Sequence, residues 1–272
     1  MKRKNLFHQK VAIITGAANG LGKALAILLA RKECHLALLD IDAANLKKTG
    51  LLLDGYAINY TLHPVDVAQS EKVAEVREEI LTVHKSIQFL FNCAGVSVTA
   101  PFLEQPKEDL HWLMGVNFFG SLNTCRAFLP ELLKQEQSHI LNVSSGLAFQ
   151  GLPNRTAYTS SKYAIRGFSE ALRAELFHTN VNVSCAFPGP IKTGMPDRSR
   201  VTDIAFLKKE IKYLAANGYD PEWVARVMLV GVSKNKSEIL IGRQVRMAVL
   251  LKRLLPRFMS RIVGKYQNRL PV

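Results

Sequence analysis

The feature that most constrains the fold of this chain is the alternation of short apolar runs with longer amphipathic stretches. Clear helical periodicity is seen, for example, in residues 21–32 and 69–84. Strand–helix–strand repetition at this pace favours a parallel sheet with helices packed on both faces. The pattern therefore predicts an α/β fold, a doubly wound parallel sheet of about seven strands in a single domain. The expected strands are residues 11–15, 35–40, 56–66, 87–92, 139–144, 181–188 and 238–242.

A glycine-rich turn follows the first expected strand and opens the first helix. It occupies residues 15–22, with the sequence TGAANGLG. Glycines permit a tight turn and let backbone N–H groups approach a pyrophosphate, and the N-terminus of the helix adds partial positive charge. A glycine cluster alone is a weak signal, but its place between a strand and a helix favours dinucleotide binding over a plain turn. The cofactor-binding residues expected here are Gly16, Asn19, Gly20, Leu21 and Gly22.

The second expected strand ends at Asp40, 18 residues after Gly22. A carboxylate at this place can accept hydrogen bonds from a ribose 2′-hydroxyl, and it would repel a 2′-phosphate. Neither Asn19 nor Ile41 supplies the positive charge that a phosphate would need. We therefore expect NAD as the cofactor in preference to NADP. Asp42 is close enough to share this role, and the alternative is that the aspartate only caps a surface helix.

The sharpest chemical signal is a serine, a tyrosine and a lysine that follow the fifth expected strand. Tyr158 and Lys162 are four residues apart at the start of a helical pattern, so they share one face. An ammonium group beside a phenol favours the phenolate and would lower the phenol's pKa from its usual value of about 10. Such a phenol can serve as a general acid/base, and Ser145 can donate a hydrogen bond to the reacting oxygen. A bare tyrosine and lysine at this spacing is common on solvated helix faces.

Taken together, the motifs resemble those of short-chain dehydrogenases/reductases of the compact type. The resemblance covers approximately residues 8–242 and rests on motifs that occur in the family's order. It implies a Rossmann-like fold and hydride transfer between a nicotinamide cofactor and a carbinol or carbonyl carbon. The motifs are TGAANGLG at 15–22, Asp40, Asp66-Val67, Asn92-Cys93-Ala94-Gly95, Asn117, Ser145, YTSSK at 158–162, and Pro188-Gly189-Pro190-Ile191-Lys192-Thr193.

The resemblance also implies cofactor contacts beyond the glycine-rich turn. Asp66 and Val67 would lie at the adenine ring, and Tyr158 and Lys162 would lie at the nicotinamide ribose. The chain departs from the family at Cys93, where asparagine is frequent, and we expect a packing change there without lost chemistry. The remaining implied contacts, along the ribose and around the carboxamide, are Asn92, Ala94, Gly95, Pro188, Gly189, Ile191 and Thr193.

A catalytic tetrad of Asn117, Ser145, Tyr158 and Lys162 is implied by the same resemblance. Asn117 would hold a water that relays protons to Lys162. Ser145 rather than Ser144 stands at the family's usual distance before the tyrosine. In the oxidation direction, Tyr158 as phenolate would take the hydroxyl proton while hydride leaves for the nicotinamide. The tetrad is complete, which argues against a relative that binds cofactor without turnover.

The substrate class is indicated only by the residues expected to line the pocket. Residues 194–218 interrupt the alternation beyond the carboxyl end of a strand, which predicts a substrate lid with a short helix at 204–216. Because apolar residues predominate, we expect a hydrophobic secondary alcohol or ketone, lipid- or steroid-like. Two alternatives stay open: an NADPH-dependent 3-oxoacyl-type reductase, and a non-catalytic NAD(H)-binding scaffold. The other expected lining residues are Phe149, Leu152, Pro153, Asn154 and Met195.

The net charge of +14 is concentrated at the two ends of the chain. Residues 1–10 carry four basic side chains and residues 243–272 carry eight, and neither segment contains an acidic residue. The body between them has a net charge of only +2, which does not suit a nucleic-acid-binding protein. We expect residues 1–242 to form the catalytic domain and residues 243–272 to form a basic amphipathic extension.

Within this extension, apolar residues recur at helical spacing over residues 250–263, and basic residues follow every fourth position from Arg253 to Lys265. Pro256 is expected to kink or divide the helix. Such a helix can lie in an anionic membrane surface. The alternative is that it packs over its own domain or a partner subunit, and the family resemblance implies a homodimer or homotetramer.

The cysteines and histidines give no sign of a metal site. The four cysteines show no CxxC spacing, and the seven histidines form no ligand-spaced cluster. The apolar stretch near the start is punctuated too early for a signal peptide, and no segment has the ~18–20 apolar residues of a spanning helix. We therefore expect a cytoplasmic protein, peripheral at the inner face of a membrane if the extension binds lipid.

Overall fold

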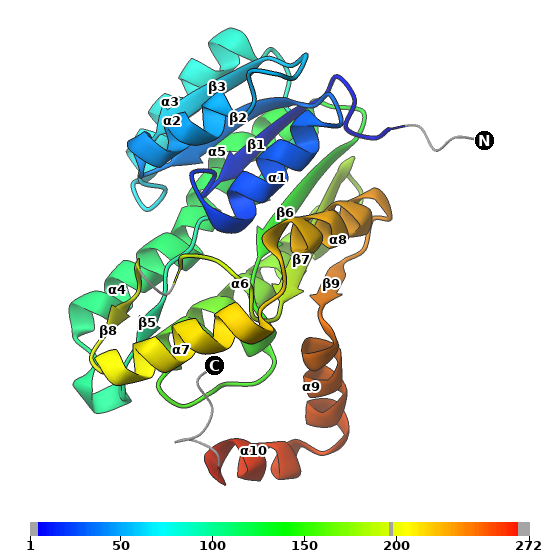
Figure 1. Cartoon of the computed structure of the whole chain (residues 1–272). Helices are drawn as coiled ribbons and strands as arrows, with labels where there is room; N and C mark the ends of the chain where they lie inside the picture. The colour runs from blue at the N-terminus through cyan, green and yellow to red at the C-terminus, as the bar shows by residue number, and fades with distance from the viewer. Residues whose placement is uncertain (1–4, 196–197, 266–272) are drawn as a thin grey trace.

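The computed structural model describes residues 5–195 and 198–265. Its centre is a parallel sheet of the strands β1 (Val11–Thr15), β2 (His35–Asp40), β3 (Tyr60–Pro64), β4 (Phe89–Asn92), β6 (Ser138–Val143), β7 (Val181–Pro188) and β9 (Glu238–Ile241). The seven strands lie in the order β3-β2-β1-β4-β6-β7-β9 (Figure 1). Strand β1 pairs with β2 on one side and with β4 on the other, so the chain winds outward from it in both directions. This confirms the expected doubly wound, Rossmann-like sheet in a single domain.

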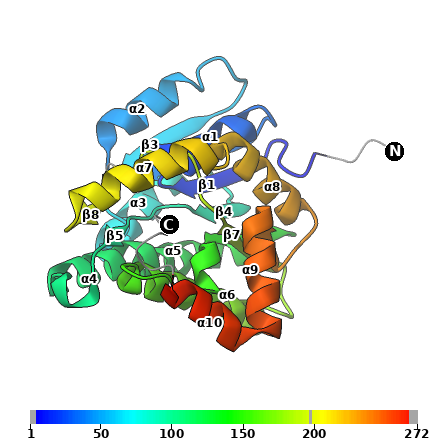
Figure 2. The ribbon, with the colours of Figure 1, turned by 60° about the horizontal axis from the view of Figure 1, so that its bottom comes forward.

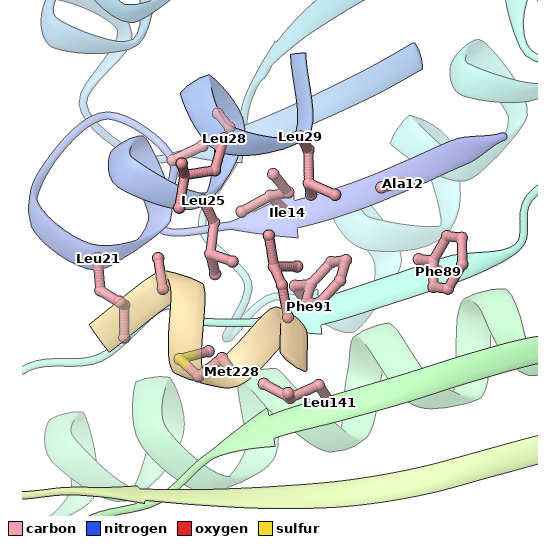
Figure 3. Packing of buried hydrophobic residues seen from close by; sticks show 14 of the residues in the cluster. Ala12, Ile14, Leu21, Leu25, Leu28, Leu29, Phe89, Phe91, Leu141 and Met228 are labelled. Atoms are coloured by element: carbon pink, nitrogen blue, oxygen red, sulfur yellow. The ribbon is translucent and has the colours of Figure 1, made fainter. Parts of the chain in front are cut away.

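Helices cover both faces of this sheet. The helices that pack on it are α1 (Gly20–Ala30), α2 (Ala43–Leu51) and α8 (Pro221–Ser233) on one face, and α3 (Ser70–Val83), α5 (Gly120–Leu133) and α6 (Thr156–Glu175) on the other. Adjacent residues of a strand point to opposite faces, so Ile13 and Ile14 belong to two separate apolar clusters. Figure 3 shows the first cluster, in which Ile14 and Phe91 of the sheet lie with Leu25 of α1 and Met228 of α8.

Strand β3 is shorter than the run expected at residues 56–66. It spans only Tyr60–Pro64, because it is an edge strand that pairs along β2 alone, and the register ends where Asp40 meets Pro64. The residues before it form turns, with the Tyr56 amide donating to the Leu53 carbonyl oxygen at 3.0 Å. The prediction of a strand over residues 56–66 is therefore too long at both ends.

Two further elements lie outside the strand–helix alternation. Strand β5 (Val98–Thr99) pairs with β8 (Arg200–Val201) in a small parallel sheet that the sequence did not indicate. Helix α4 (Lys107–Met114) passes into a π-helical turn, Gly115–Phe119, before α5 begins. The helix expected at 204–216 is α7 (Ile204–Asn217), and the Asp203 carboxylate caps it by accepting from the Ala205 and Phe206 amides.

The C-terminal extension begins directly after the sheet. Helix α9 (Arg243–Leu254) starts two residues after β9, and α10 (Pro256–Lys265) follows it. Pro256 divides the segment into two helices, as expected. Figure 1 shows α9 and α10 extending from the end of β9, at the same lower end of the molecule as α7. The helices of the described residues include none with the length and apolar character needed to cross a bilayer.

Candidate active site

The glycine-rich turn packs tightly against the end of the neighbouring strand. Gly16 has a φ of +68°, and a Cβ atom there would lie 2.8 Å from the Cα of Ala94. A Cβ at Gly22 would lie 2.2 Å from the Gly16 carbonyl oxygen. Thr15 Oγ1 accepts hydrogen bonds from the Cys93 and Ala94 amides, each at 3.0 Å, so it ties β1 to the segment after β4. Only glycines permit this close approach of backbone to backbone.

This turn has the features that a bound dinucleotide needs. Helix α1 begins at Gly20 and follows Asn19, whose Nδ2 atom is buried without a hydrogen-bond partner. A Cβ at Gly20 would lie 3.1 Å from Cγ2 of Thr193, so the turn faces the segment after β7. An orphaned donor beside a helix N-terminus and a glycine cradle fits a phosphate-containing cofactor. The residues present therefore fit the dinucleotide that the sequence predicts.

Asp40 stands at the end of β2 with its carboxylate turned toward the glycine-rich turn. Its Oδ2 accepts from the Ala18 amide at 2.9 Å, and its Oδ1 accepts from the Asp42 amide at 2.9 Å. Asp42 instead caps α2 by accepting from the Asn45 amide, and this bond lowers the pKa of its carboxyl group. Of the two aspartates, the helix cap is thus Asp42, and Asp40 keeps the position expected for ribose recognition.

A basic side chain that the sequence analysis missed lies close to this pair. Arg198, in the predicted lid, has Nη2 at 3.8 Å from Oδ2 of Asp42. The sequence gives no local signal for this contact because 156 positions separate the two residues. Because Asp42 is two residues after Asp40, Arg198 brings positive charge close to the expected ribose site.

The two residues expected at the adenine ring follow β3. Asp66 Oδ1 accepts from the Ala68 amide at 2.9 Å. The side chain of Val67 is buried against α5, where a Cβ at Gly120 would lie 2.6 Å from Val67 Cγ2. The Val67 carbonyl oxygen accepts from Nδ2 of Asn123 at 2.9 Å. Both residues are held by the protein at the carboxyl end of the sheet, beside β2.

The side chain of Asn92 lies in the core of the protein, whereas the resemblance implies a contact with the cofactor. Its amide side chain is buried, with Nδ2 donating to Oδ1 of Asn142 at 2.8 Å and Oδ1 accepting from Thr124 Oγ1 at 2.7 Å. The side chain is therefore engaged in the core between β4, β6 and α5. The backbone of Ala94, which follows, lies against Gly16 of the glycine-rich turn, where the cofactor is expected, and Gly95 lies beside Asn117 and Lys162.

Cys93, the one departure from the family pattern, has a structural setting. Its amide donates to Thr15 Oγ1, and burial raises the pKa of its thiol to about 12. A thiol with such a pKa stays protonated and unreactive near neutral pH. This matches the packing role expected for the position.

Asn117 lies in the π-helical turn and is almost fully buried. Its Oδ1 accepts from the Val96 amide at 2.8 Å, and its Nδ2 donates to the Val96 carbonyl oxygen at 3.0 Å and to Ser161 Oγ at 3.1 Å. A single-turn π-helix frequently marks a functional position. Here it turns the asparagine toward α6, and a Cβ at Gly95 would lie 3.3 Å from Asn117 Oδ1 and 3.6 Å from Lys162 Nζ.

Ser145, Tyr158 and Lys162 come together where β6 ends and α6 begins. Ser145 follows β6 and accepts from the Leu147 amide at 3.2 Å. Lys162 Nζ lies 5.5 Å from the centroid of the Tyr158 ring and donates to the Val143 carbonyl oxygen at 3.1 Å. Ser144 is buried, and its hydroxyl donates to the Lys162 carbonyl oxygen at 2.7 Å, so it fixes the helix backbone. The serine available to a substrate is therefore Ser145.

The electrostatics of this site differ from the simple expectation. Burial raises the pKa of Tyr158, while Arg155 and the Ser145 hydroxyl lower it and Glu210 raises it. Burial also lowers the pKa of Lys162 to about 8. The sequence predicts that Lys162 lowers the pKa of the Tyr158 phenol. In the structure this pKa is raised instead, because desolvation outweighs the neighbouring charges and the Lys162 ammonium group donates to the Val143 carbonyl oxygen.

The segment after β7 closes the other side of the cofactor position. Pro188 ends β7, and the Gly189 amide donates to the Ile241 carbonyl oxygen at 3.0 Å. Ile191 forms a parallel bridge with Tyr219, and the Thr193 amide donates to the Ile191 carbonyl oxygen at 2.9 Å. These bonds hold Thr193 opposite the start of α1.

A buried ion pair beside Tyr158 was also missed. Arg155, which precedes α6, pairs with Glu210 of α7, and its Nη1 donates to Ser97 Oγ at 2.7 Å. The side chains are only 5% and 8% exposed. The pair joins the predicted lid to the start of the helix that carries the tyrosine. Because the arginine and the glutamate are 55 positions apart in the chain, the sequence does not predict that they pair.

Phe149, which is expected to line the substrate pocket, packs in a small aromatic cluster. Phe149 is buried against Phe187, with ring centroids 4.7 Å apart, and the Arg166 guanidinium lies 4.0 Å above its ring. Within residues 5–195 and 198–265, no group of three or more potential metal ligands comes together.

Comparison with known proteins agrees with this geometry. The sequence model of the family described as "short chain dehydrogenase" matches residues 10–203. The chain belongs to this family. It is therefore an oxidoreductase of the short-chain dehydrogenase/reductase type with a nucleotide-binding fold, as the resemblance implied.

Individual relatives span nearly the whole chain. SadH of Mycobacterium tuberculosis is 32% identical over 264 residues, which are 95% of each protein. The 3-oxoacyl-[acyl-carrier-protein] reductase FabG of Thermotoga maritima is 30% identical over 234 residues, which are 85% of this chain and 93% of FabG. A short-chain dehydrogenase/reductase from Burkholderia phymatum, solved in complex with NAD, superposes with a TM-score of 0.85 at 26% identity and covers 98% of this chain.

Proposed function

We propose that this oxidoreductase transfers hydride between NAD(H) and a hydrophobic secondary alcohol or ketone, with Tyr158 as the general acid/base. The observation that carries the proposal is the convergence of Lys162 and Asn117 on Gly95, beside the glycine-rich turn, with Tyr158 one helical turn away. Proton-transfer groups and a dinucleotide cradle meet at the carboxyl edge of the sheet, where α/β folds bind their ligands.

Each side chain has a distinct task in this mechanism. NAD, when bound, supplies the hydride acceptor for oxidation, and NADH supplies the donor for reduction. Tyr158 takes the proton from the substrate hydroxyl or returns it, and Ser145 donates a hydrogen bond to the same oxygen. Lys162, whose lowered pKa allows it to gain and lose a proton near neutral pH, passes protons onward. Asn117 orients this end of α6 through Ser161.

Asp40 supports the preference for NAD. Its carboxylate stands at the end of β2, held by the Ala18 amide of the glycine-rich turn, where it would accept a hydrogen bond from a ribose hydroxyl and repel a phosphate. The Burkholderia phymatum relative was solved with NAD. Arg198 beside Asp42 is the feature that speaks for NADP, and the assay below includes both cofactors for this reason.

The hydrophobic substrate is inferred from the lid and from the loop before α6. Leu152 and Pro153 are partly buried between Ser145 and Tyr158, and Met195 is partly exposed at the start of the lid. These side chains favour an apolar molecule, lipid- or steroid-like. The specific alternative is an NADPH-dependent 3-oxoacyl-type reductase, because FabG of Thermotoga maritima is a relative. A non-catalytic NAD(H)-binding scaffold is disfavoured by the four catalytic side chains.

One experiment separates these functions. The purified protein is assayed at the NADH absorbance band with NAD and NADP against secondary alcohols of increasing apolar surface, and with NADH and NADPH against ketones and a 3-oxoacyl thioester. We expect turnover with NAD(H) that rises with apolar surface. Preferred turnover of the thioester with NADPH would establish the alternative, and cofactor binding without any turnover would establish the scaffold.

A homodimer or homotetramer and a cytoplasmic location complete the proposal. Phe119 at the end of the π-helical turn, Leu133 of α5 and Tyr163 of α6 are large side chains that stand exposed on α6 and on the helix that continues from the turn carrying Asn117. A partner subunit would cover them. The cysteines described, Cys34, Cys93, Cys125 and Cys185, are all free thiols, which fits a reducing compartment.

A further inference from the structure

Helix α9 is rooted beside the predicted catalytic serine. Val245 is buried with Phe149 and Phe187, and a Cβ at Gly146 would lie 2.8 Å from Val245 Cγ2. Gly146 directly follows Ser145. The start of the C-terminal extension is therefore part of the wall behind the active site and is fixed relative to it.

Beyond this root, the extension stands away from the protein with an exposed apolar surface. Met247, Leu250 and Leu254 of α9 are spaced for one helix face, and each is more than half exposed. Leu255 and Phe258 continue this surface into α10. Helix α10 contains no buried residue, and its principal contacts are with α9. Exposed large apolar residues gathered in this way mark an interaction site.

The same two helices are basic without any acidic residue. Between residues 243 and 265 there are seven lysines and arginines and no aspartate or glutamate. In α10, Arg257, Arg261 and Lys265 form a basic stripe at four-residue spacing, and Phe258 and Ile262 belong to the adjoining apolar stripe. The body of the protein is nearly neutral, so a large part of the net positive charge of the chain lies in these two helices.

We propose that α9 and α10 form a docking surface that binds an anionic lipid bilayer. An amphipathic helix pair with apolar residues on one side and lysines and arginines on the other lies in the interface of such a membrane, with its apolar side in the acyl boundary. A second copy of this chain is a poorer occupant. A two-fold contact would bring two like-charged surfaces together, because both copies contribute the same patch.

Docking there would set the orientation of the active site. Strand β9 ends at Ile241 and α9 begins at Arg243, so the docking surface arises at the carboxyl edge of the sheet, as do Ser145 and the lid helix α7. Figure 2 shows α7, α9 and α10 together on the side of the molecule that faces the viewer. The bound bilayer would lie at the substrate side of the fold. Membrane binding itself does not depend on the proposed reaction.

The test measures co-sedimentation of the full-length protein with phosphatidylcholine vesicles and with vesicles that also contain phosphatidylglycerol. We expect binding to the anionic vesicles only, with a loss of binding as salt is raised. Replacing four basic residues, Arg246→Gln/Arg253→Gln/Arg257→Gln/Arg261→Gln, should weaken the partition coefficient by about 10²–10³-fold, because each basic side chain near the surface contributes about a fivefold factor.

Two matched variants make the test specific. The variant Lys32→Gln/Lys47→Gln/Lys85→Gln/Lys236→Gln removes the same charge from exposed positions outside the docking surface and should bind nearly as the wild type does. The apolar variant Leu250→Ser/Leu254→Ser/Phe258→Ser should lose binding even at low salt. Unchanged thermal midpoints establish that the variants are folded.

Three results would overturn the proposal. Equal binding to neutral and anionic vesicles would exclude charge recognition, and equal losses in the two charge variants would show that only net charge matters. Absence of vesicle binding, together with a fall in the molecular mass of the apolar variant by light scattering, would assign the surface to a second copy of the chain.

Discussion

At the scale of single residues, the orientation of a side chain decides its role in the proposed site more than the residue type does. Ser144 and Ser145 are adjacent, yet the first bonds to the backbone of α6 and the second caps the turn that faces Tyr158. Asp40 accepts from the glycine-rich turn, while Asp42 caps α2, so only Asp40 stands at the position proposed for cofactor recognition. In both pairs, the hydrogen bonds of the structure distinguish two neighbouring residues of the same type, which the sequence alone does not.

Replacing the tyrosine should remove catalysis without removing the cofactor. Tyr158→Phe keeps the ring and its packing but lacks the hydroxyl that moves the proton, so kcat should fall by about 10²–10⁴-fold. Cofactor affinity, measured by fluorescence titration with NADH, should change little. Tyr163→Phe, on the exposed side of the same helix, is the control and should keep wild-type turnover. Near-normal turnover in Tyr158→Phe would refute the assignment.

The two aspartates offer a matched pair for the cofactor. Asp40→Ser removes the carboxylate at the expected ribose position, and the ratio of kcat/KM for NAD over NADP should fall about tenfold or more. Asp42→Asn retains a side-chain oxygen that can cap α2, so it should cost less than about 1 kcal/mol of stability and shift the ratio less than Asp40→Ser does. Steady-state kinetics with both cofactors decides between them. An equal shift in both variants would contradict a specific role of Asp40.

Lys162 should give the folded protein a pH-dependent stability. Its pKa is lowered from 10.5 to about 8, so between these pH values the unfolded chain holds more protons than the folded one. The free energy of unfolding should therefore rise with pH across this window because of this residue, and the penalty is fully present below pH 8. Lys162→Met should flatten that rise by an amount on the order of a few kcal/mol.

Urea unfolding at a series of pH values, without added cofactor, measures this effect. The exposed Lys47→Met serves as the control and should follow the wild-type curve. If the curves of Lys162→Met and the wild type run parallel between pH 8 and 10.5, the lysine is not desolvated as the structure indicates.

At the scale of elements, helix α6, which carries Tyr158, and the predicted lid are joined by a buried ion pair. Arg155 precedes α6 by one residue and pairs with Glu210 of α7, while Ser97 near β5 accepts a further hydrogen bond from the same guanidinium. The small sheet of β5 and β8 ties the segment after β4 to the predicted lid through backbone bonds. The predicted lid is thus held at two places, one of them three residues before Tyr158.

Breaking the buried pair should loosen α7. Glu210→Leu leaves the Arg155 charge buried and alone, which costs about 3–5 kcal/mol locally. Amide hydrogen exchange of residues 204–217 should become faster, and KM should rise. The double variant Arg155→Met/Glu210→Leu should recover part of the protection, with a coupling energy of about 0.5–3 kcal/mol.

A second ion pair of the lid is the control for this cycle. Arg200 pairs with Asp109 at 2.6 Å, but the arginine side chain is 46% exposed. Arg200→Gln should therefore change exchange in α7 little, because exposed pairs contribute only about 0–1 kcal/mol. Independent, additive effects of the Arg155 and Glu210 substitutions would show that the two residues do not act as a pair.

At the scale of the whole molecule, apolar surface and charge are segregated. One set of exposed apolar residues lies on the π-helical turn, α5 and α6, next to the proposed catalytic residues, whereas the set on α9 and α10 lies in a basic segment. The first surface carries no comparable excess of positive charge and suits a second subunit. The second suits an anionic bilayer.

The proposed oligomer should depend on the first surface. Phe119→Ser removes a half-exposed aromatic side chain from the expected subunit interface and should lower the molecular mass measured by light scattering at micromolar concentration. Phe102→Ser, which removes an even more exposed phenylalanine near β5, is the control and should leave the mass unchanged. A wild-type protein that is monomeric throughout this range would refute the proposal.

Much of this protein can be predicted from its amino-acid order. The alternation of strands and helices determined the doubly wound sheet, and local motifs indicated the glycine-rich turn, the Tyr158–Lys162 pair and Ser145. These are features that are expressed over a few neighbouring residues, because periodicity and backbone sterics act locally. The length of β3 could not be predicted, since it is set by the strand beside it.

What only the tertiary structure decided are the contacts between residues far apart in the chain. The Arg155–Glu210 pair, the approach of Arg198 to Asp42 and the burial that lowers the pKa of Lys162 arise when separate elements pack together. Desolvation and ion pairing depend on distance in space, and a linear sequence does not contain that distance. The sequence determined which groups are available for chemistry, and packing decided their charges and partners.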